Sequence, residues 1–252
     1  MKRTIGAWLA AAFLLLGQGV QARADDKDVT AVLDRAIAAL GGEAKLARAT
    51  AISWKGKGTI IFNENDNPIR TKTTLQGIDH HRAEFEGDFN GNEVKGATVL
   101  AGEKGWRKFG EETQDLEGDG LAAEKRRAYL QAASTTILPL KGKSFKVESA
   151  PDQQVAGRAA AAIKATGPDG KTFTLAFDKE TGLPVRMTAT VRGWQGEDYE
   201  QETTMADFQD FGGIKFPTKT ESKRDGNPFV KLELSEFKVE DKADPDTFAE
   251  PK

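Results

Sequence analysis

The sequence predicts a mainly β domain in which two helices cap one large, curved antiparallel sheet. Apolar residues recur at helical spacing near the start of the 252-residue chain and again near its middle. In about eleven other segments they alternate with polar residues, and short runs of Gly, Asn, Asp and Pro separate these segments. Such alternation between turns is typical of an antiparallel meander with one apolar face. Because a sheet of that many strands twists and curls, the apolar face should become the inside of a barrel or half-barrel.

Residues 1–24 are expected to be a secretory signal peptide. The segment begins with the basic residues of MKR, and the apolar run that follows is too short to span a bilayer. Ala22 and Ala24 then occupy the two small-residue positions of an A-x-A cleavage site. A membrane anchor is the alternative. Cleavage after Ala24 would leave residues 25–252 as a single periplasmic domain, without a cysteine for lipid attachment or disulfide formation.

The two helices are expected at the start of this domain and between its two groups of strands. The first has one apolar stripe and ends at Gly41-Gly42, a pair that favours the left-handed C-terminal stop. A second short turn is possible over 43–47. The mid-chain helix covers 121–134, and Pro139 terminates any continuation. The stripe of the first helix consists of Val29, Leu33, Ala36, Ile37 and Leu40.

The strands follow from alternation with a period of two. In 52–62 the large apolar residues fall on one face and the lysines on the other, and 80–89 shows the same pattern. Further strands are expected at about 69–77, 93–101, 104–109, 144–149, 154–165, 171–177, 184–193, 198–208, 214–223 and 228–238.

Composition and motifs exclude several function classes. Lys and Arg number 36 against 39 Asp and Glu, so there is no basic excess to neutralise the phosphates of a nucleic acid. The chain has no G-x-S-x-G motif and no glycine loop for a nucleotide. The acidic run 110–120 is expected to be a solvated surface loop, because catalytic carboxylates need a partly dry site. We therefore expect neither an enzyme nor a cofactor.

A metal site is not expected either. His80 and His81 are adjacent on a strand, so their imidazoles should point to opposite faces. The segment NENDNP (63–68) offers oxygen ligands but lacks the glycine and glutamate of a calcium loop, so we interpret it as a turn.

The candidate ligand-binding residues are the apolar side chains on one face of successive strands. They could line a cavity that accepts an acyl chain, or they could fill a solid core, and the residues alone do not decide between the two. They are Trp54, Ile60, Phe62, Phe85, Phe89, Phe173, Leu175, Val185, Met187 and Val191.

The order of several segments resembles the LolA/LolB-like carriers of bacterial lipoproteins, which include outer-membrane lipoprotein-sorting proteins. The resemblance covers most of the chain after the signal peptide. Each matching segment is weak evidence by itself, and the order of the segments carries the resemblance. The matching segments are ALGGEAKL, ISWKGKGTI, ILPL, FDKETGLPVRM and FGGIKFPTKTE.

The resemblance implies an unclosed β-barrel capped by helices, with an apolar cavity for acyl chains. It implies a monomeric periplasmic carrier or binding protein for lipidated proteins or lipid-like ligands, with transient membrane-protein partners. The family's carriers use an arginine in an early strand; Arg70 and Arg82 lie in that region, but neither aligns with it, so no functional residue is transferred. The alternative is a non-enzymatic structural or interaction module with a filled β core.

Overall fold

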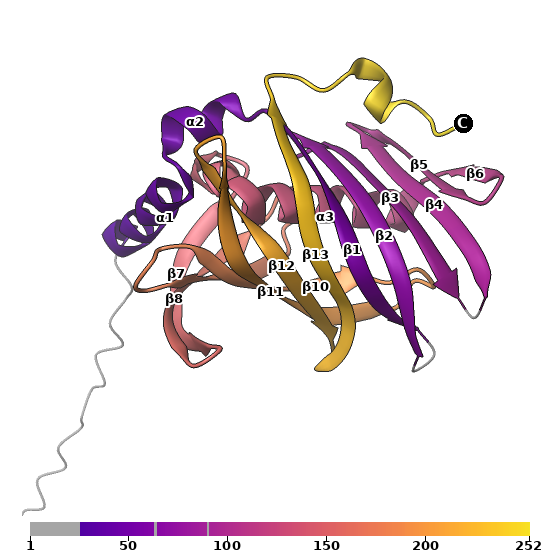
Figure 1. Cartoon of the computed structure of the whole chain (residues 1–252). Coiled ribbons are helices and arrows are strands. Elements are labelled where there is room, and N and C mark those ends of the chain that lie inside the picture. The colour runs from indigo at the N-terminus through magenta and orange to yellow at the C-terminus, as the bar shows by residue number, and fades with distance from the viewer. Residues whose placement is uncertain (1–25, 63–64, 90) are drawn as a thin grey trace, which may run out of the picture.

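One antiparallel sheet of thirteen strands dominates the structure, a computed structural model that describes residues 26–62, 65–89 and 91–252. The sheet is unclosed, because its linear order begins at β6 and ends at β7. It curves around helix α3 (Gly118–Thr136), while helices α1 (Asp26–Leu40) and α2 (Glu43–Arg48) lie at one end (Figure 1). The expected fold, a helix-capped half-barrel, is confirmed. Among the described residues, no helix combines the length and apolar character needed to cross a membrane.

The sheet consists of two meanders joined at a single seam. The first meander runs from β1 to β6 and the second from β7 to β13, and β1 pairs with β13 between them. Helix α3 and the 3-10 turn η1 (Leu138–Lys141) connect the two meanders. The strands are β1 (Ala51–Phe62), β2 (Asn65–Gln76), β3 (His80–Phe89), β4 (Asn92–Ala101), β5 (Lys104–Phe109), β6 (Glu112–Asp115), β7 (Lys146–Val155), β8 (Arg158–Thr166), β9 (Thr172–Asp178), β10 (Pro184–Arg192), β11 (Asp198–Phe211), β12 (Ile214–Arg224) and β13 (Asn227–Glu240).

Several expected boundaries differ from the structure. The strand expected over 154–165 is interrupted by a tight turn at Ala156-Gly157, where both residues have positive φ. The acidic run 110–120 contains the short edge strand β6 rather than only loop. In the segment 63–68, residues 63 and 64 lie outside the described part of the chain, and β2 has already begun at Asn65. The alternation of polar and apolar residues therefore located the strands but did not reveal every chain reversal between them.

Helix α1 forms as its apolar stripe predicts. All five stripe residues are buried, and the chain reverses at Gly41 and Gly42, which have φ values of 134° and 91°. The Gly42 amide donates to the Ile37 carbonyl at 2.9 Å, which satisfies one of the last helical acceptors. A methyl group on Gly41 would lie 2.3 Å from the Gly213 carbonyl oxygen, so this helix end fits closely against the β11–β12 turn.

Helix α3 is held on the sheet by one buried arginine. The Arg126 side chain donates to the carbonyls of Thr190 at 2.7 Å and Thr172 at 3.0 Å, on and beside strands β10 and β9. It also forms an ion pair with Asp169 at 3.0 Å, and Tyr129 donates to the same carboxylate at 2.7 Å. Every charge here has a partner, so the network fixes the helix without an orphaned buried ion.

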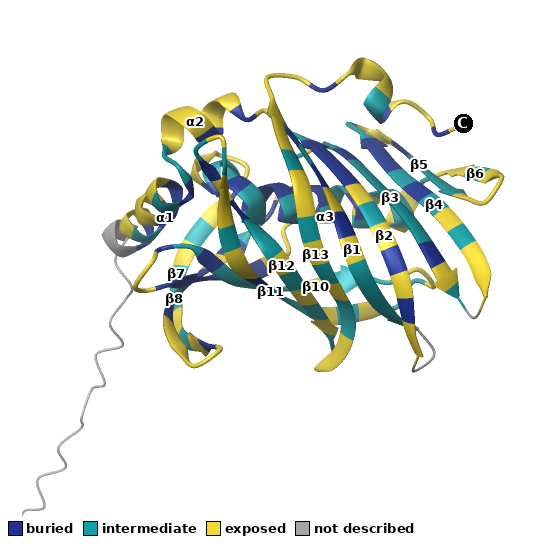
Figure 2. Ribbon diagram, viewed as in Figure 1, coloured by how far each residue is buried: buried dark blue, intermediate teal, exposed yellow. Residues whose placement is uncertain are grey.

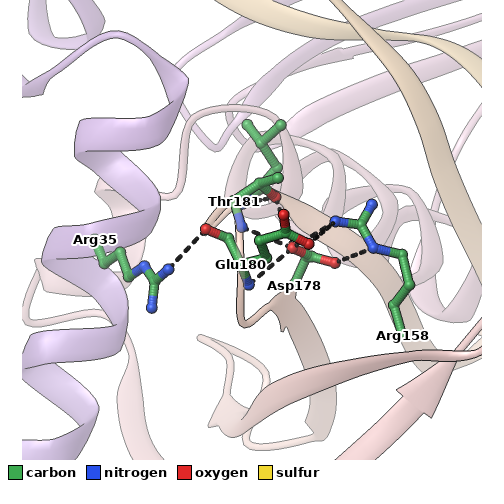
Figure 3. A network of polar contacts seen from close by, with 6 residues as sticks. Arg35, Arg158, Asp178, Glu180 and Thr181 are labelled. Atoms are coloured by element: carbon green, nitrogen blue, oxygen red, sulfur yellow. Dashed lines mark hydrogen bonds and ion pairs between the residues drawn. The ribbon is translucent and has the colours of Figure 1, made fainter.

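The β9–β10 turn, within FDKETGLPVRM, is fastened to two other elements (Figure 3). Asp178 accepts from the amides of Glu180 and Thr181 at 3.0 and 2.7 Å, and Arg158 of β8 binds its carboxylate at 2.9 Å. Arg35 of α1 donates to the Glu180 carbonyl at 2.9 Å. Burial disfavours the charged Asp178, but these donors outweigh it and lower its pKa. The hairpin is thus a rigid wall of the half-barrel, docked against α1.

The C-terminal segment packs on the outer face of the first meander. The turn η2 (Pro245–Phe248) places Phe248 in a small apolar cluster with Ala51, Val99 and Ala243. Arg82 donates to the Thr247 carbonyl at 3.3 Å. Elsewhere along β1 and β2, buried and exposed bands alternate with the pleat (Figure 2). Large apolar side chains therefore gather on the other, inner face, which faces α3.

Candidate functional site

The inner face is defined by the strand register. Ile52, Trp54, Gly56, Gly58 and Ile60 of β1 point inward, and each pairing carries the same face to the next strand. The face has two zones. The packed zone lies under the helices; the open zone lies toward the far ends of β1, β2, β3 and β13, where Ile60, Phe85, Phe89, Val230 and Leu232 are only partly buried.

The packed zone is a solid core. Tyr129 and Leu130 of α3 join α1 residues and strand residues in one apolar cluster. Trp54 stacks on Phe237 with ring centroids 5.8 Å apart. Leu175 is fully buried and Phe173 is 2% exposed. In this zone the side chains fill the space between helices and sheet.

The structure distributes the ten candidate ligand-binding residues among different surroundings. Val185 packs with Val155 and Ala176 in a separate cluster away from the helices. The side chain of Phe62 lies outside the described part of the structure. The remaining eight share the inner face: Trp54, Phe173 and Leu175 lie in the packed zone, Met187 and Val191 pack against it, and Ile60, Phe85 and Phe89 lie in the open zone.

Glycines let the aromatic rings of the open zone lie flat on the sheet. A methyl group on Gly96 of β4 would lie 2.4 Å from the ring of Phe85, which pairs with it across the β3–β4 ladder. A methyl group on Gly87 would lie 2.7 Å from the Phe89 ring. The rings of Phe85 and Phe89 therefore occupy the space that a larger side chain at Gly96 or Gly87 would need.

An aromatic clasp joins the two meanders at the open zone. Trp194, in the β10–β11 turn, lies 5.5 Å from Phe85 of β3 and 6.3 Å from Phe109 of β5, measured between ring centroids. Trp194 is 53% exposed and Phe109 is 52% exposed. The hydrogen-bonded path from β3 to β10 runs through the β1–β13 seam, and the clasp adds a ring contact between the ends of that path without hydrogen bonds between strands.

Three arginines, from β5, β12 and α3, lie at one end of the open zone. Arg107 of β5 lies 5.6 Å from the ring centroid of Trp194. Arg224 of β12 lies 4.9 Å from the Tyr199 ring and 3.7 Å from the Phe229 ring. Arg127 projects from α3 and binds Glu124. Among the described residues, neither Arg107 nor Arg224 is within ion-pair distance of a carboxylate.

Glu124 is the buried acid of this region. It and His81 are each 1% exposed at the side chain, and the His81 Nδ1 lies 3.1 Å from its carboxylate. Burial opposes its ionisation, but Arg127, the His81 hydrogen bond and the charge of Arg107 outweigh that effect and lower its pKa to about 2. The His81 Nε2 is buried without a hydrogen-bond partner.

His80 faces the opposite way from His81, as the alternation predicts. Its ring packs edge-on to Phe248 on the outer face, and its Nδ1 lies 2.9 Å from Asp79. Within the described ranges, no three His, Asp or Glu side chains gather in a way that could hold a metal ion.

Two grooves lie away from the inner face. One, of about 450 Å³, is on the outer face of β2–β5, where lysines and Arg70 alternate with Glu84 and Glu86. The other, of about 310 Å³, lies between α1 and the η1–β7 segment and is lined by Val29, Leu33 and Phe145. The first is a solvated surface of mixed charge, and the second lies at the edge of the packed zone.

Sequence reasoning did not identify the clasp or the bordering arginines as parts of a site. Trp194 and Phe109 lie in or beside turns, where isolated aromatic residues have no periodic neighbours. Arg107 and Arg224 lie at inward positions of their strands. In the sequence, however, a single charged residue at such a position looks the same as a residue that ends a strand. The inward position of a charge on two separate strands was the available clue.

The fold has counterparts among solved structures, at low sequence identity. A LolA superfamily protein from Nitrosomonas europaea superposes with a TM-score of 0.56 and 13% identity, covering 88% of this chain and 97% of that one. A DUF1329 family protein from Desulfovibrio piger gives 0.53 and 12%, covering 88% and 97%. A putative outer-membrane lipoprotein-sorting protein domain from Vibrio parahaemolyticus gives 0.52 and 11%, covering 86% and 97%. No protein-family model and no curated protein matches the chain. The chain therefore has the fold of the LolA superfamily.

Proposed function

We propose that this protein is a carrier or binding protein that shelters acyl chains, of lipoproteins or of other apolar ligands, on the inner face of its sheet. One observation carries the proposal: beside the aromatic clasp, the inner face has an open zone in which Ile60, Phe85 and Leu232 are only partly buried. A soluble fold normally buries such side chains or covers them with a partner. The fold shared with a lipoprotein-sorting domain supports the same conclusion.

Burial alone supplies enough free energy for such a role. Each buried methylene contributes about 0.8 kcal/mol, so ten methylenes sheltered on the open zone correspond to roughly 8 kcal/mol before the cost of ordering the chain. No covalent chemistry is needed. We therefore assign no catalytic role to Glu124 or His81, whose contacts are explained by anchoring α3 to β3.

The proposal includes a location. With residues 1–24 removed as a signal peptide, the protein acts as a monomer in the periplasm and meets membrane proteins transiently when cargo is loaded or released. It uses no cofactor, and its balanced charge does not suit nucleic acid.

A second candidate function is a structural or interaction module with a filled core. The packed zone favours it, because Leu175, Ile163 and Phe216 are fully buried there. The two functions differ in what occupies the open zone: cargo in the first, and only water and the rearranged side chains in the second.

Neighbouring isoleucines on β1 provide a matched test. Ile60 points inward and Ile61 outward, and both are partly buried. A dye-displacement assay with palmitate and a diacylated lipopeptide should show binding to the wild type, accompanied by a higher melting temperature. Ile60→Asp should weaken binding strongly, whereas Ile61→Asp should leave it unchanged. If neither ligand binds the wild type, the carrier function is wrong and the structural module replaces it.

A further inference from the structure

Two of the three guanidinium groups beside the open zone, those of Arg107 and Arg224, have no carboxylate within ion-pair distance in the described part of the chain. Arg107 and Arg224 flank the β10–β11 hairpin tip, contacting Trp194 and Tyr199 respectively. Arg127 reaches the same region from α3. Three separate elements of the chain, β5, β12 and α3, therefore bring positive charge to one end of the open zone.

In the described part of the chain, none of the carboxylates of this region forms an ion pair with Arg107 or Arg224. Glu124 is held by Arg127 and His81. Glu197 accepts a hydrogen bond from Tyr199 at 2.7 Å, and Asp225 accepts from the Glu200 amide at 2.9 Å. Arg224 instead donates to the neutral Gln201 at 3.2 Å.

The surroundings of Arg224 disfavour the charged form of its side chain. Burial and the positive charge of Arg127 lower its pKa, even though Glu197 and Asp225 act in the opposite direction. Partly dry guanidinium groups of like charge repel one another, and an anion placed among them would relieve that repulsion.

Polar and apolar surfaces meet at this end of the open zone. Phe229 and Phe85 lie beside Arg224 and the clasp. The hydroxyls of Thr203 and Ser222 lie 2.9 Å apart on the same inward face, next to Gln201. A ligand that fits both surfaces has an apolar chain and a compact headgroup that accepts hydrogen bonds.

We propose that Arg107, Arg127 and Arg224 form a headgroup site that selects anionic amphiphiles, whose carboxylate or phosphate lies among the guanidinium groups while the acyl chain lies on the open zone. The inference rests on the proposed function, because it requires that the inner face binds acyl chains. Guanidinium suits either anion, since its planar N–H groups match two oxygens at once. The proposal thus names the class of cargo: acidic lipids, with neutral acyl compounds bound more weakly.

Pairs of ligands that share their chains but differ in charge test the site. Palmitate and hexadecanol share a C16 chain, and dioleoyl-phosphatidylglycerol and dioleoylglycerol share two acyl chains. For at least one pair, the anionic member should bind the full-length mature protein about tenfold more tightly, as expected for charge-assisted hydrogen bonds. The pair that shows the preference tells whether the headgroup is a carboxylate or a phosphate.

Variants then assign the preference to the proposed residues. The double variant Arg107→Gln, Arg224→Gln should abolish the preference while retaining affinity for the neutral ligand. Arg70→Gln removes the same charge from an exposed outer position and should retain the preference. If the wild type binds charged and neutral ligands equally, or if the double variant keeps the preference, the inference is overturned while the carrier function stands. If no acyl ligand binds, the carrier function itself fails.

A measurement on the wild type keeps the test independent of folding in the variants. Palmitate labelled with carbon-13 at its carboxyl carbon should, when bound, remain ionised to a lower pH than a fatty acid in a neutral micelle. A bound carboxyl that titrates at the same pH as in the micelle, or at a higher one, would overturn a carboxylate site. The phosphatidylglycerol pair decides the phosphate case by the same affinity comparison.

Discussion

Replacing Glu124 by Gln should destabilise the protein far more than an equivalent change at the surface. The Glu124 carboxylate is almost completely buried and bound by Arg127 and His81. Its pKa is lowered from 4.5 to about 2, which corresponds to about 3 kcal/mol of stabilisation at neutral pH. Removing one member of a fully buried ion pair typically costs about 3–5 kcal/mol, and Arg127 is 32% exposed, so the loss should lie at the lower end of that range. We expect Glu124→Gln to lower the free energy of unfolding in urea by about 3 kcal/mol.

Glu103 provides the matched control. It forms an ion pair with Lys125, which like Arg127 belongs to α3, but its side chain is 90% exposed. Glu103→Gln should therefore change the free energy of unfolding by less than about 1 kcal/mol. Equal small losses in the two variants, with unchanged dependence on urea concentration, would refute the assignment of Glu124 as an ionised, buried partner.

The same carboxylate sets an acid limit to stability. Because the folded-state pKa lies below the unfolded value of 4.5, its contribution is fully present above that pH and is lost as pH falls from 4.5 toward 2. The wild type should lose stability across this window, and Glu124→Gln should lose less. A variant whose acid unfolding curve parallels that of the wild type would contradict the mechanism.

Three further predictions concern export, the two zones and the hairpin. Intact-mass measurement of periplasmic protein should show cleavage between Ala24 and Asp25, and a mass that retains residues 1–24 would contradict the export prediction. Leu175→Ala should cost about 2–5 kcal/mol in urea denaturation because its site is fully packed, whereas Phe85→Ala should cost less, with a loss that depends on bound ligand; equal, ligand-independent losses would mean that Phe85 belongs to a solid core. Asp178→Ala should lower the free energy of unfolding by about 1–3 kcal/mol, because it removes the charged acceptor of the Thr181 amide and of Arg158, and a loss below about 0.5 kcal/mol would show that water replaces that acceptor.

The period-two pattern predicted the strands well in segments where large apolar residues alternate with charged residues. The strand expected at 80–89 matches β3, and that at 104–109 matches β5. The method failed over 154–165, because the alanines of RAAAA carry little contrast between the two faces, and the reversal at Ala156-Gly157 lacks a strong turn pair. The short strand β6 was missed because its four residues are largely polar and pair only at the sheet edge.

The candidate site was less accessible to sequence reasoning than the fold. The sequence pattern predicts that the side chains of Ile60, Phe85 and Leu175 point inward. How far each one is buried depends on helices that lie far away in the sequence. Val185 illustrates the limit. The β9–β10 ladder has a register irregularity between Pro184 and Arg186, and Val185 consequently packs with a different cluster from Met187. Such an irregularity shifts side chains between faces and leaves no mark in the hydrophobic pattern.

The seam between β1 and β13 has a consequence for the order in which the protein folds. Residues at the two ends of the domain meet there: Thr50 donates a hydrogen bond to the carbonyl of Asp241, 191 positions later. Each meander consists of hairpins that can form early, but the halves join only after the last strand has been supplied. A chain that emerges from the N-terminus onward therefore cannot complete the half-barrel until nearly all of it is present, and truncation before β13 should remove the hydrogen-bonded seam between the meanders.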